Sequence, residues 1–131
     1  MKNVLPNNLK RPHILIVDDD FWVVDVMVDF VSDIMGCEGH GVYSAEDAIA
    51  HIRRYGDIDL VITDIHMMGM DGLDLTEVIR KEYKSKVIVM SGIKYRGAGK
   101  EAINAGASDF FSKPINLGRL KVMIESVLEP V

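Results

Sequence analysis

The sequence is poor in cysteine, proline and aromatic residues. Its 131 residues include one cysteine, four prolines and one tryptophan, and aromatic side chains make up 7% of the chain. The lone Cys37 cannot form an internal disulfide, so packing must stabilise the fold, and a reducing compartment is expected. No apolar run approaches the roughly 18–20 residues of a membrane-spanning helix. The start, MKNVLPNNLKRP, lacks the apolar stretch of a signal peptide, so residues 1–11 are expected to form a polar tail. These absences predict a soluble cytoplasmic domain with no membrane partner.

Positive charge is also scarce, and it is unevenly distributed. The chain has 20 Asp and Glu against 15 Lys and Arg, which gives a net charge of -5. Segment 18–33 contains six aspartates and no basic residue, whereas residues 80–121 carry ten Lys and Arg and three acids. Concentrated acidic charge repels nucleic acid and attracts cations, so a DNA-binding module is not expected within these residues.

The hydrophobic pattern predicts a parallel α/β fold. Continuous apolar runs rich in β-branched residues are typical of strands buried on both faces. They occupy residues 13–17, 60–63, 86–90 and 109–112, with a weaker edge-strand candidate at 40–43. Helical spacing of apolar residues occurs at 21–35, after Ser44, at 73–83, at 98–105 and after Asn116. Five β-α repeats in one domain of this length predict a doubly wound parallel sheet with five helices on two faces.

Polar side chains follow the predicted strands. Asp18, Asp19 and Asp20 follow the first strand, and Asp64, Ser91 and Lys113 follow later ones. Because ligands of such sheets gather at the carboxyl ends of the strands, these groups are expected to converge. Clustered carboxylates repel one another unless a cation compensates, and Mg²⁺ (or Mn²⁺) with oxygen ligands suits them. A hydroxyl and an ammonium could hold phosphoryl oxygens. No Walker-type glycine-rich loop is present, so a phosphoryl-transfer site without a nucleotide cradle is predicted.

Four segments together resemble the receiver domain of two-component response regulators. They are ILIVDDD (14–20), DLVITDIHMMGMDG (59–72), VIVMSG (87–92) and AGASDFFSKPI (105–115), in the family's order. The resemblance covers residues 12–129 and implies a flavodoxin-like sheet of strand order 2-1-3-4-5. It also implies a domain that takes a phosphoryl group from a sensor histidine kinase or a histidine phosphotransfer protein.

The resemblance assigns roles to individual residues. Asp64 matches the phosphoacceptor. Asp18, Asp19, Asp64 and the backbone carbonyl of His66 match the metal ligands, and Ser91 and Lys113 match the groups that stabilise the phosphoryl oxygens. Phe110 matches the aromatic switch residue, and the Lys113–Pro114 bond is expected to be cis. The resemblance implies a phosphoacceptor that dephosphorylates itself slowly, and not an enzyme. The effector domain or protein stays unknown.

The sequence departs from the family pattern in three respects. Met68 stands where the family usually has proline, so the loop after Asp64 is expected to be less rigid. Phe110 replaces the common tyrosine and lacks its hydroxyl. Gly97 and Gly99 are expected to make the fourth helix short or mobile.

Other readings of the same residues stay open at this point. The segment ILIVDDD also fits a DxD-type phosphatase or phosphotransferase of the haloacid-dehalogenase kind, although that pattern wants Thr or Val where Trp22 stands. A receiver-like interaction module that is never phosphorylated is the third class. His13, His40 and His51 are scattered, and no pair has a metal-ligand spacing on one helix face, so no histidine metal site is expected.

Overall fold

The fold is a five-stranded parallel sheet between two layers of helices. The computed structural model describes residues 11–56, 58–92 and 96–129. The strands are β1 (His13–Val17), β2 (Glu38–Val42), β3 (Leu60–Asp64), β4 (Lys86–Ser91) and β5 (Asp109–Ser112). The helices are α1 (Phe21–Asp29), α2 (Ala45–Tyr55), α3 (Gly72–Glu82), α4 (Ala98–Ala105) and α5 (Leu117–Leu128), and a π-helical segment η1 (Phe30–Ile34) extends α1.

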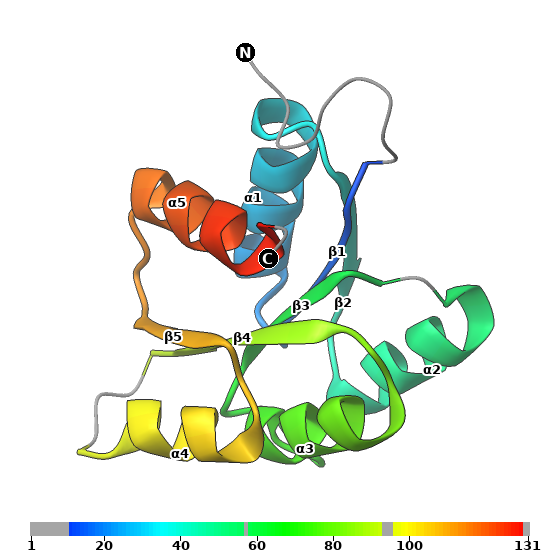
Figure 1. Cartoon of the computed structure of the whole chain (residues 1–131), viewed down its shortest axis with the longest axis vertical. Helices are drawn as coiled ribbons and strands as arrows, with labels where there is room; N and C mark the ends of the chain where they lie inside the picture. The colour runs from blue at the N-terminus through cyan, green and yellow to red at the C-terminus, as the bar shows by residue number, and fades with distance from the viewer. Residues whose placement is uncertain (1–10, 57, 93–95, 130–131) are drawn as a thin grey trace.

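The strand order is β2-β1-β3-β4-β5, and every pairing is parallel. The predicted doubly wound architecture is therefore confirmed. The chain reverses its direction of travel across the sheet after β2, so β1 and β3 lie side by side at the centre (Figure 1). Their carboxyl ends form the switch point at which ligands of such sheets bind.

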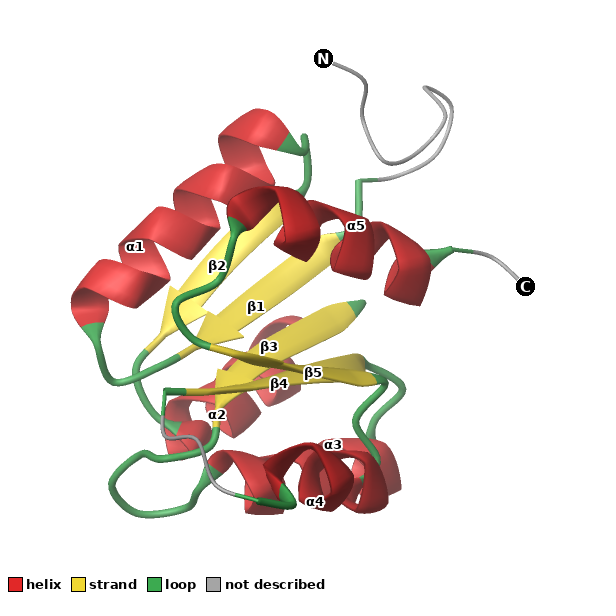
Figure 2. Ribbon diagram, turned by 90° about the vertical axis from the view of Figure 1, so that its left-hand side faces the viewer, coloured by secondary structure: helices red, strands yellow, loops and turns green. Residues whose placement is uncertain are grey.

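Two hydrophobic cores hold the layers together, one on each face of the sheet. Helices α1 and α5 cover one face, and α2, α3 and α4 cover the other (Figure 2). The alternation of strand side chains explains the division: Ile14 and Ile16 enter the first core, whereas Leu15 and Val17 enter the second. All four are fully buried, which is why the runs are continuous rather than alternating in hydropathy.

The helix boundaries follow the capping signals in the sequence. The side chains of Ser44 and Asn116 accept hydrogen bonds from the backbone N–H groups of Asp47 and Arg119, at 3.0 and 3.1 Å, and so begin α2 and α5. Gly106 ends α4 in the left-handed conformation with φ of 113°. Helix α4 is eight residues long, in line with the expectation of a short fourth helix.

Two elements differ from the sequence-based boundaries. Strand β2 begins at Glu38, two residues before the predicted range, because Gly39 and Gly41 hide its apolar pattern. Gly39 lies under η1 and Gly41 under α1, where an added Cβ would collide with Ser32 and with Val24. The predicted 21–35 helix changes to π-helical geometry at Phe30. No helix in the described ranges is long and apolar enough to cross a membrane. The predicted tail lies, apart from Arg11, outside the described residues.

Candidate functional site

The carboxyl edge of the sheet brings together polar residues from four strands. Asp18 follows β1, Asp64 is the last residue of β3, Ser91 is the last residue of β4 and Lys113 follows β5. Parallel pairing places these strand ends at the same edge of the sheet. The pairing extends to the last residues of the strands, since Asp64 pairs with Met90 and Ser91 with Ser112. The predicted convergence is therefore present in the structure.

Three carboxylates form the centre of the site. Asp18, Asp19 and Asp64 each offer an oxygen atom, and these atoms all lie within 4.8 Å of one another. Asp18 is 1% exposed and Asp64 is 5% exposed, whereas Asp19 faces solvent. Oxygen donors with this charge and spacing suit a hard divalent cation that keeps some of its water ligands.

Lys113 links two of the three carboxylates. Its Nζ donates a hydrogen bond to Oδ2 of Asp18 at 2.8 Å and lies 3.4 Å from Oδ1 of Asp64. Burial alone would lower the pKa of Lys113, but the hydrogen bond and the charge of Asp18, with a smaller contribution from Asp64, raise it above its usual value. The ammonium group is therefore charged throughout the physiological range.

Asp64 is the least compensated of the three acids. Its pKa is raised, first by burial and then by the charge of Asp18, and the nearby Lys113 only partly offsets this rise. Oδ1 of Asp64 is buried and has no hydrogen-bond partner within the described part of the chain, because Lys113 approaches it as an ion pair without hydrogen-bond geometry. A buried oxygen of this kind is suited to a cation or to an electrophile.

The third aspartate of the run has a different task. Asp20 is the N-cap of α1, and its Oδ1 accepts hydrogen bonds from the backbone N–H groups of Trp22 at 3.0 Å and Val23 at 3.4 Å. Its own N–H donates to Oδ1 of Asp18 at 3.0 Å, which orients that carboxylate. The run of three aspartates thus divides into two site residues and one helix cap.

A side chain of α2 forms a hydrogen bond to the loop between β3 and α3. Oε2 of Glu46, on α2, accepts a hydrogen bond from the backbone N–H of Met70 at 3.2 Å. Met68, which stands where proline is usual, is 88% exposed, and His66 is also exposed. Glu46 was not predicted from the sequence, because its partner Met70 is 24 residues away and no local pattern connects the two.

Gly72 was also missed, although it is the residue that allows the loop to return. A Cβ at this position would collide with the backbone carbonyl oxygen of Asp64. The N–H of Gly72 instead donates to the carbonyl of Ile65 at 2.8 Å, so α3 begins directly against the end of β3. The glycine of the segment MDG was a findable signal, because only glycine permits so close a backbone approach.

The remaining predicted residues surround the carboxylates. Ser91 is 1% exposed at the end of β4, and its carbonyl accepts from the N–H of Lys113 at 2.8 Å. The Lys113–Pro114 peptide bond is cis. Phe110 is half-buried on β5, and its ring lies close to Gly99 in the first turn of α4, where an added Cβ would be 3.4 Å from it.

Beside the site lies an apolar cavity of about 280 Å³. It is bounded by the start of α1, the end of β5 and the segment leading into α5, and Trp22, Phe111 and Ile115 are among the residues that line it. Lys113 and Pro114 form its border with the acidic pocket. Trp22 is 75% exposed, so its indole is available to report on both regions.

The fold and the site together define a class of protein: a flavodoxin-like α/β domain with an acidic, lysine-bordered pocket at its switch point. A family model described as the response regulator receiver domain matches residues 14–125. The chain therefore belongs to the receiver domain family of two-component systems, which confirms the resemblance seen in the sequence.

Individual relatives agree with this membership. The chain is 32% identical over 115 residues to the chemotaxis protein CheY of Listeria monocytogenes, covering 86% of this chain and 94% of that protein. It is 37% identical over 118 residues to a protein-glutamate methylesterase/protein-glutamine glutaminase of Trichodesmium erythraeum, covering 87% of this chain. The crystal structure of the receiver domain of NtrX from Brucella abortus superimposes with a TM-score of 0.82 at 34% identity, covering 90% of this chain and 99% of that one.

The relatives differ in how much of their length the chain spans. It spans nearly all of CheY but only 33% of the methylesterase. Receiver domains are thus found among these relatives both alone and as part of longer proteins.

Proposed function

We propose that Asp64 accepts a phosphoryl group from a phosphohistidine of a sensor histidine kinase or a histidine phosphotransfer protein. The observation that carries the proposal is the buried Oδ1 of Asp64, which has no hydrogen-bond partner within the described residues and lies beside Asp18, Asp19 and Lys113. A carboxylate in this state is available as a nucleophile. Lys113 can pair with a phosphoryl oxygen, and Asp18 and Asp19 can hold a cation that offsets the phosphoryl charge.

The transfer is a displacement at phosphorus. An oxygen of Asp64 forms the new P–O bond, the P–N bond to the donor imidazole breaks, and the freed imidazole nitrogen keeps the electron pair and takes up a proton. The product is an acyl phosphate on Asp64. Lys113, already 3.4 Å from Oδ1, would pair with a phosphoryl oxygen, and the Ser91 hydroxyl would hold another. The protein contributes mainly position and electrostatics.

The carboxylates of Asp18, Asp19 and Asp64, with the backbone carbonyl of His66, would hold Mg²⁺ or Mn²⁺. The donor set fits such an ion, because it consists of convergent oxygens that carry more negative charge than Lys113 neutralises. When bound, the ion offsets the negative charge that gathers on the phosphoryl oxygens.

Phosphorylation would act as a switch rather than as a catalytic turnover. Movement of Ser91 toward the phosphoryl group would open space at β5, and Phe110 would move inward and alter the face formed by α4, β5 and α5. Because Phe110 has no hydroxyl, packing alone would hold the inward position. The altered face would bind an effector domain or protein in the cytoplasm, and hydrolysis of the acyl phosphate would be a slow side reaction.

Intact-mass spectrometry after treatment with acetyl phosphate and Mg²⁺ tests the proposal. Wild-type protein should gain the mass of one phosphoryl group per chain. Asp64→Asn should gain none, and Asp19→Asn should be labelled far more slowly because cation binding is weakened. Labelling of Asp64→Asn to the same extent as wild type would refute the assignment.

The DxD phosphatase reading is disfavoured by the role of Asp20. That chemistry needs Asp18 and Asp20 in one pocket, whereas Oδ1 of Asp20 caps α1 and accepts from Trp22 and Val23. Turnover of a phosphate monoester that is lost in Asp18→Asn but kept in Asp64→Asn would restore this alternative.

Trp22, the only tryptophan, tests the hypothesis that the chain is an interaction module that is never phosphorylated. The indole lies one helical turn after the acidic residues, so its emission should change with millimolar Mg²⁺ and again with beryllofluoride. An emission spectrum that responds to neither addition would favour the non-phosphorylated module.

A further inference from the structure

Three histidines that are far apart in the sequence lie together on the face of the sheet that α2 covers. His13 is the first residue of β1 and His40 is the middle residue of β2. The register pairs Leu15 with His40 and His13 with Glu38, so the two histidines lie on the same face, two positions apart along neighbouring strands. Helix α2 brings His51 over this face. We call the three residues the histidine cluster.

The two strand histidines are spaced for chelation. Nδ1 of His13 lies 3.3 Å from Nε2 of His40, and the two rings are close to parallel, with an angle of 10° and a centroid distance of 5.5 Å. Two imidazole nitrogens bound to one tetrahedral Zn²⁺ at about 2.0–2.1 Å stand about 3.3–3.4 Å apart. The observed distance between the two nitrogens therefore fits two ligands of one metal ion as well as it fits a hydrogen bond.

His51 supplies the second observation. Its ring centroid lies 5.2 Å from that of His40, and its Nε2 is buried without a hydrogen-bond partner in the part of the chain that the structure describes. A buried ring nitrogen without a partner is unfavourable unless something binds it. His51 would join the other two by a change of side-chain rotamer, with Tyr55 packed behind it at a centroid distance of 4.8 Å.

The surroundings of His40 and His51 favour the neutral imidazole, which is the form that binds metals. Burial lowers the pKa of His40 and of His51, and repulsion from the neighbouring imidazoles lowers both further. Two carboxylates border the cluster. Oδ2 of Asp59 accepts from the backbone N–H of His13 at 2.7 Å, and Glu38 pairs with Arg11 at 3.6 Å.

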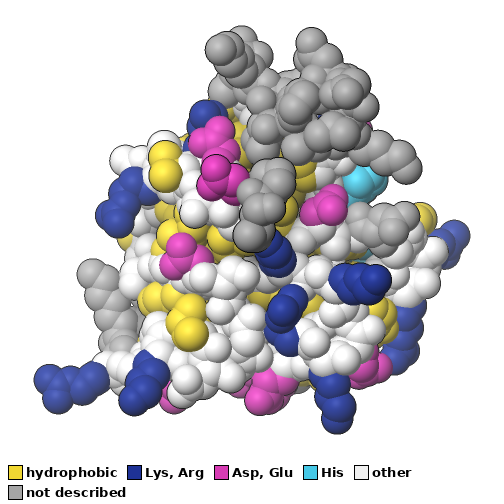
Figure 3. Space-filling model, in the orientation of Figure 1, with side chains coloured by type: hydrophobic (Ala, Val, Ile, Leu, Met, Phe, Trp, Pro, Cys, Tyr) yellow, Lys and Arg dark blue, Asp and Glu magenta, His cyan; other side chains and the backbone are white. Residues whose placement is uncertain are grey.

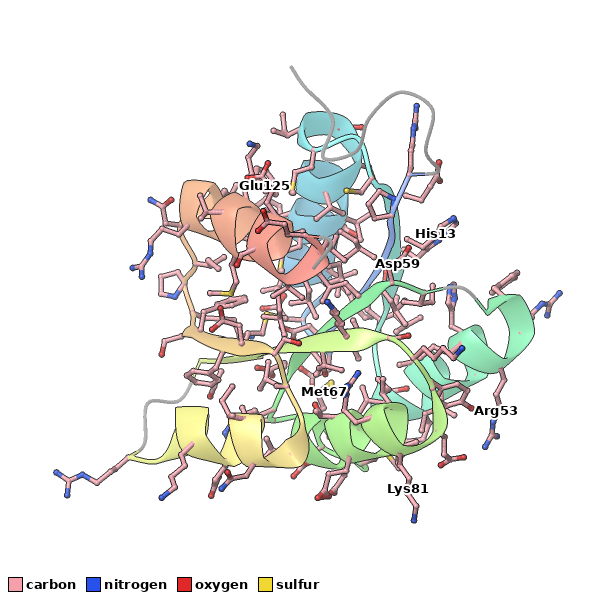
Figure 4. All side chains as sticks on the ribbon, in the orientation of Figure 1. His13, Arg53, Asp59, Met67, Lys81 and Glu125 are labelled. Atoms are coloured by element: carbon pink, nitrogen blue, oxygen red, sulfur yellow. The ribbon has the colours of Figure 1, made fainter. Side chains whose placement is uncertain are left out.

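The three histidines of the cluster are each partly exposed to solvent. His13 and Asp59 lie side by side where β1 begins and β3 is about to begin (Figure 4). In the same orientation a histidine side chain reaches the molecular surface (Figure 3, cyan).

We propose that the histidine cluster binds a borderline divalent transition-metal ion of the Zn²⁺ class, with His13 and His40 as the first two ligands and His51 as the third. Nitrogen donors distinguish this site from the acidic pocket, since Mg²⁺ takes oxygen ligands. The two sites are also separate in space: His13 is five residues before Asp18 on a strand that rises about 3.3 Å per residue. A bound ion would tie β1, β2 and α2 together.

Zinc titration of the whole chain in excess Mg²⁺ tests the proposal, because Mg²⁺ then occupies the acidic pocket. Calorimetry should show one Zn²⁺ per chain. In His40→Ala the dissociation constant should rise by at least tenfold, since even the loss of a group that merely orients a ligand typically costs about 10–100-fold in affinity. Lys121→Met changes a surface residue of α5, on the opposite face of the sheet, and should leave Zn²⁺ affinity unchanged.

A measurement on the wild-type protein keeps the test decisive if His40→Ala fails to fold. Imidazole ¹⁵N chemical shifts should change for His13 and His40 as Zn²⁺ is added, and should return on chelation with EDTA. Unchanged shifts for these two residues at millimolar Zn²⁺ would overturn the proposal. So would Zn²⁺ binding that disappears in Asp19→Asn but persists in His40→Ala, because the ion would then belong to the acidic pocket. None of these readouts depends on phosphorylation.

Discussion

Nζ of Lys113 lies 2.8 Å from Oδ2 of Asp18 and so connects two residues that are 95 positions apart in the sequence, at the switch point of the sheet. The ammonium group lies in a pocket that three carboxylates form. Its positive charge offsets part of their negative charge, as a bound divalent metal ion would. This arrangement makes the stability of the domain depend on the charge balance of its functional site.

Replacing Lys113 with Met should therefore destabilise the protein when Mg²⁺ is absent. Asp18 is almost fully buried and would lose its charged partner, but the Lys113 side chain is 21% exposed, so the unfolding free energy should fall by about 1–3 kcal/mol rather than by the larger value of a fully buried pair. Mg²⁺ should restore more stability to the variant than to wild type. Urea denaturation with and without Mg²⁺ measures both effects.

Lys121→Met is the matched control for this change. Lys121 pairs with Glu125 at 3.1 Å on the surface of α5, so its loss should change stability by less than about 0.5–1 kcal/mol. Equal stability of Lys113→Met and wild type in Mg²⁺-free buffer would contradict the role given to Lys113.

The pH dependence of stability should carry the signature of Asp64. Its pKa in the folded protein is raised above the ordinary value of 3.8, so the folded state holds this proton more tightly than the unfolded state. The contribution is stabilising at low pH and is lost as the pH rises from about 3.8 through the raised value. Without Mg²⁺, the stability of Asp64→Asn relative to wild type should therefore increase with pH across this window. A difference that stays constant with pH would show that Asp64 titrates normally.

Gly72→Ala should strain the joint between β3 and α3. The added Cβ meets the carbonyl oxygen of Asp64, a backbone atom that cannot move without displacing the carboxylate below it. The expected loss of unfolding free energy is about 2–3 kcal/mol, at the upper end for overpacking. Thermal and urea denaturation measure the loss.

Gly92→Ala gives the comparison for Gly72→Ala. Its Cβ would meet only the Lys113 Cε, at an ordinary 3.7 Å, so stability should change by less than about 1 kcal/mol. The account of Gly72 fails if the two variants are equally stable.

Glu46 should control the order of the loop after Asp64 without contributing much to global stability. Its Oε2 accepts from the N–H of Met70, and Glu46→Ala removes this acceptor whereas Glu46→Gln keeps one. The alanine variant should lose less than about 0.5 kcal/mol, as is usual for exposed residues. The amide of Met70 should exchange with deuterium several-fold faster in Glu46→Ala than in Glu46→Gln. If the Met70 amide exchanges at one rate in wild type and both variants, Glu46 does not control the order of this loop.

Much of the fold was predictable from local sequence signals. Continuous apolar runs such as ILIV at 14–17 report burial on both faces, and the alternation of runs with helical spacing leaves few topologies open. The residues that follow the strands could be predicted to lie together, because the carboxyl ends of parallel strands meet at one edge of the sheet. Asp18, Asp64 and Lys113 were therefore expected near one another, and the structure places them there.

Apart from Gly72, the site features that sequence reasoning missed depend on packing between elements that are distant in the sequence. His13, His40 and His51 have no shared periodicity, and the interpretation that they are scattered is wrong in space: strand register and the path of α2 bring them together. The hydrogen bond between Glu46 and Met70 likewise leaves no signal in the sequence, because nothing near Glu46 indicates which backbone group it faces.

Chemical mapping of the modified residue tests the central claim most directly. After treatment with acetyl phosphate and Mg²⁺, borohydride reduces an acyl phosphate to an alcohol, and peptide sequencing by mass spectrometry locates that alcohol. The account predicts reduction at position 64 in wild type and at no carboxylate in Asp64→Asn. Reduction at Asp18 or Asp19, or stoichiometric phosphorylation that borohydride leaves untouched, would contradict it.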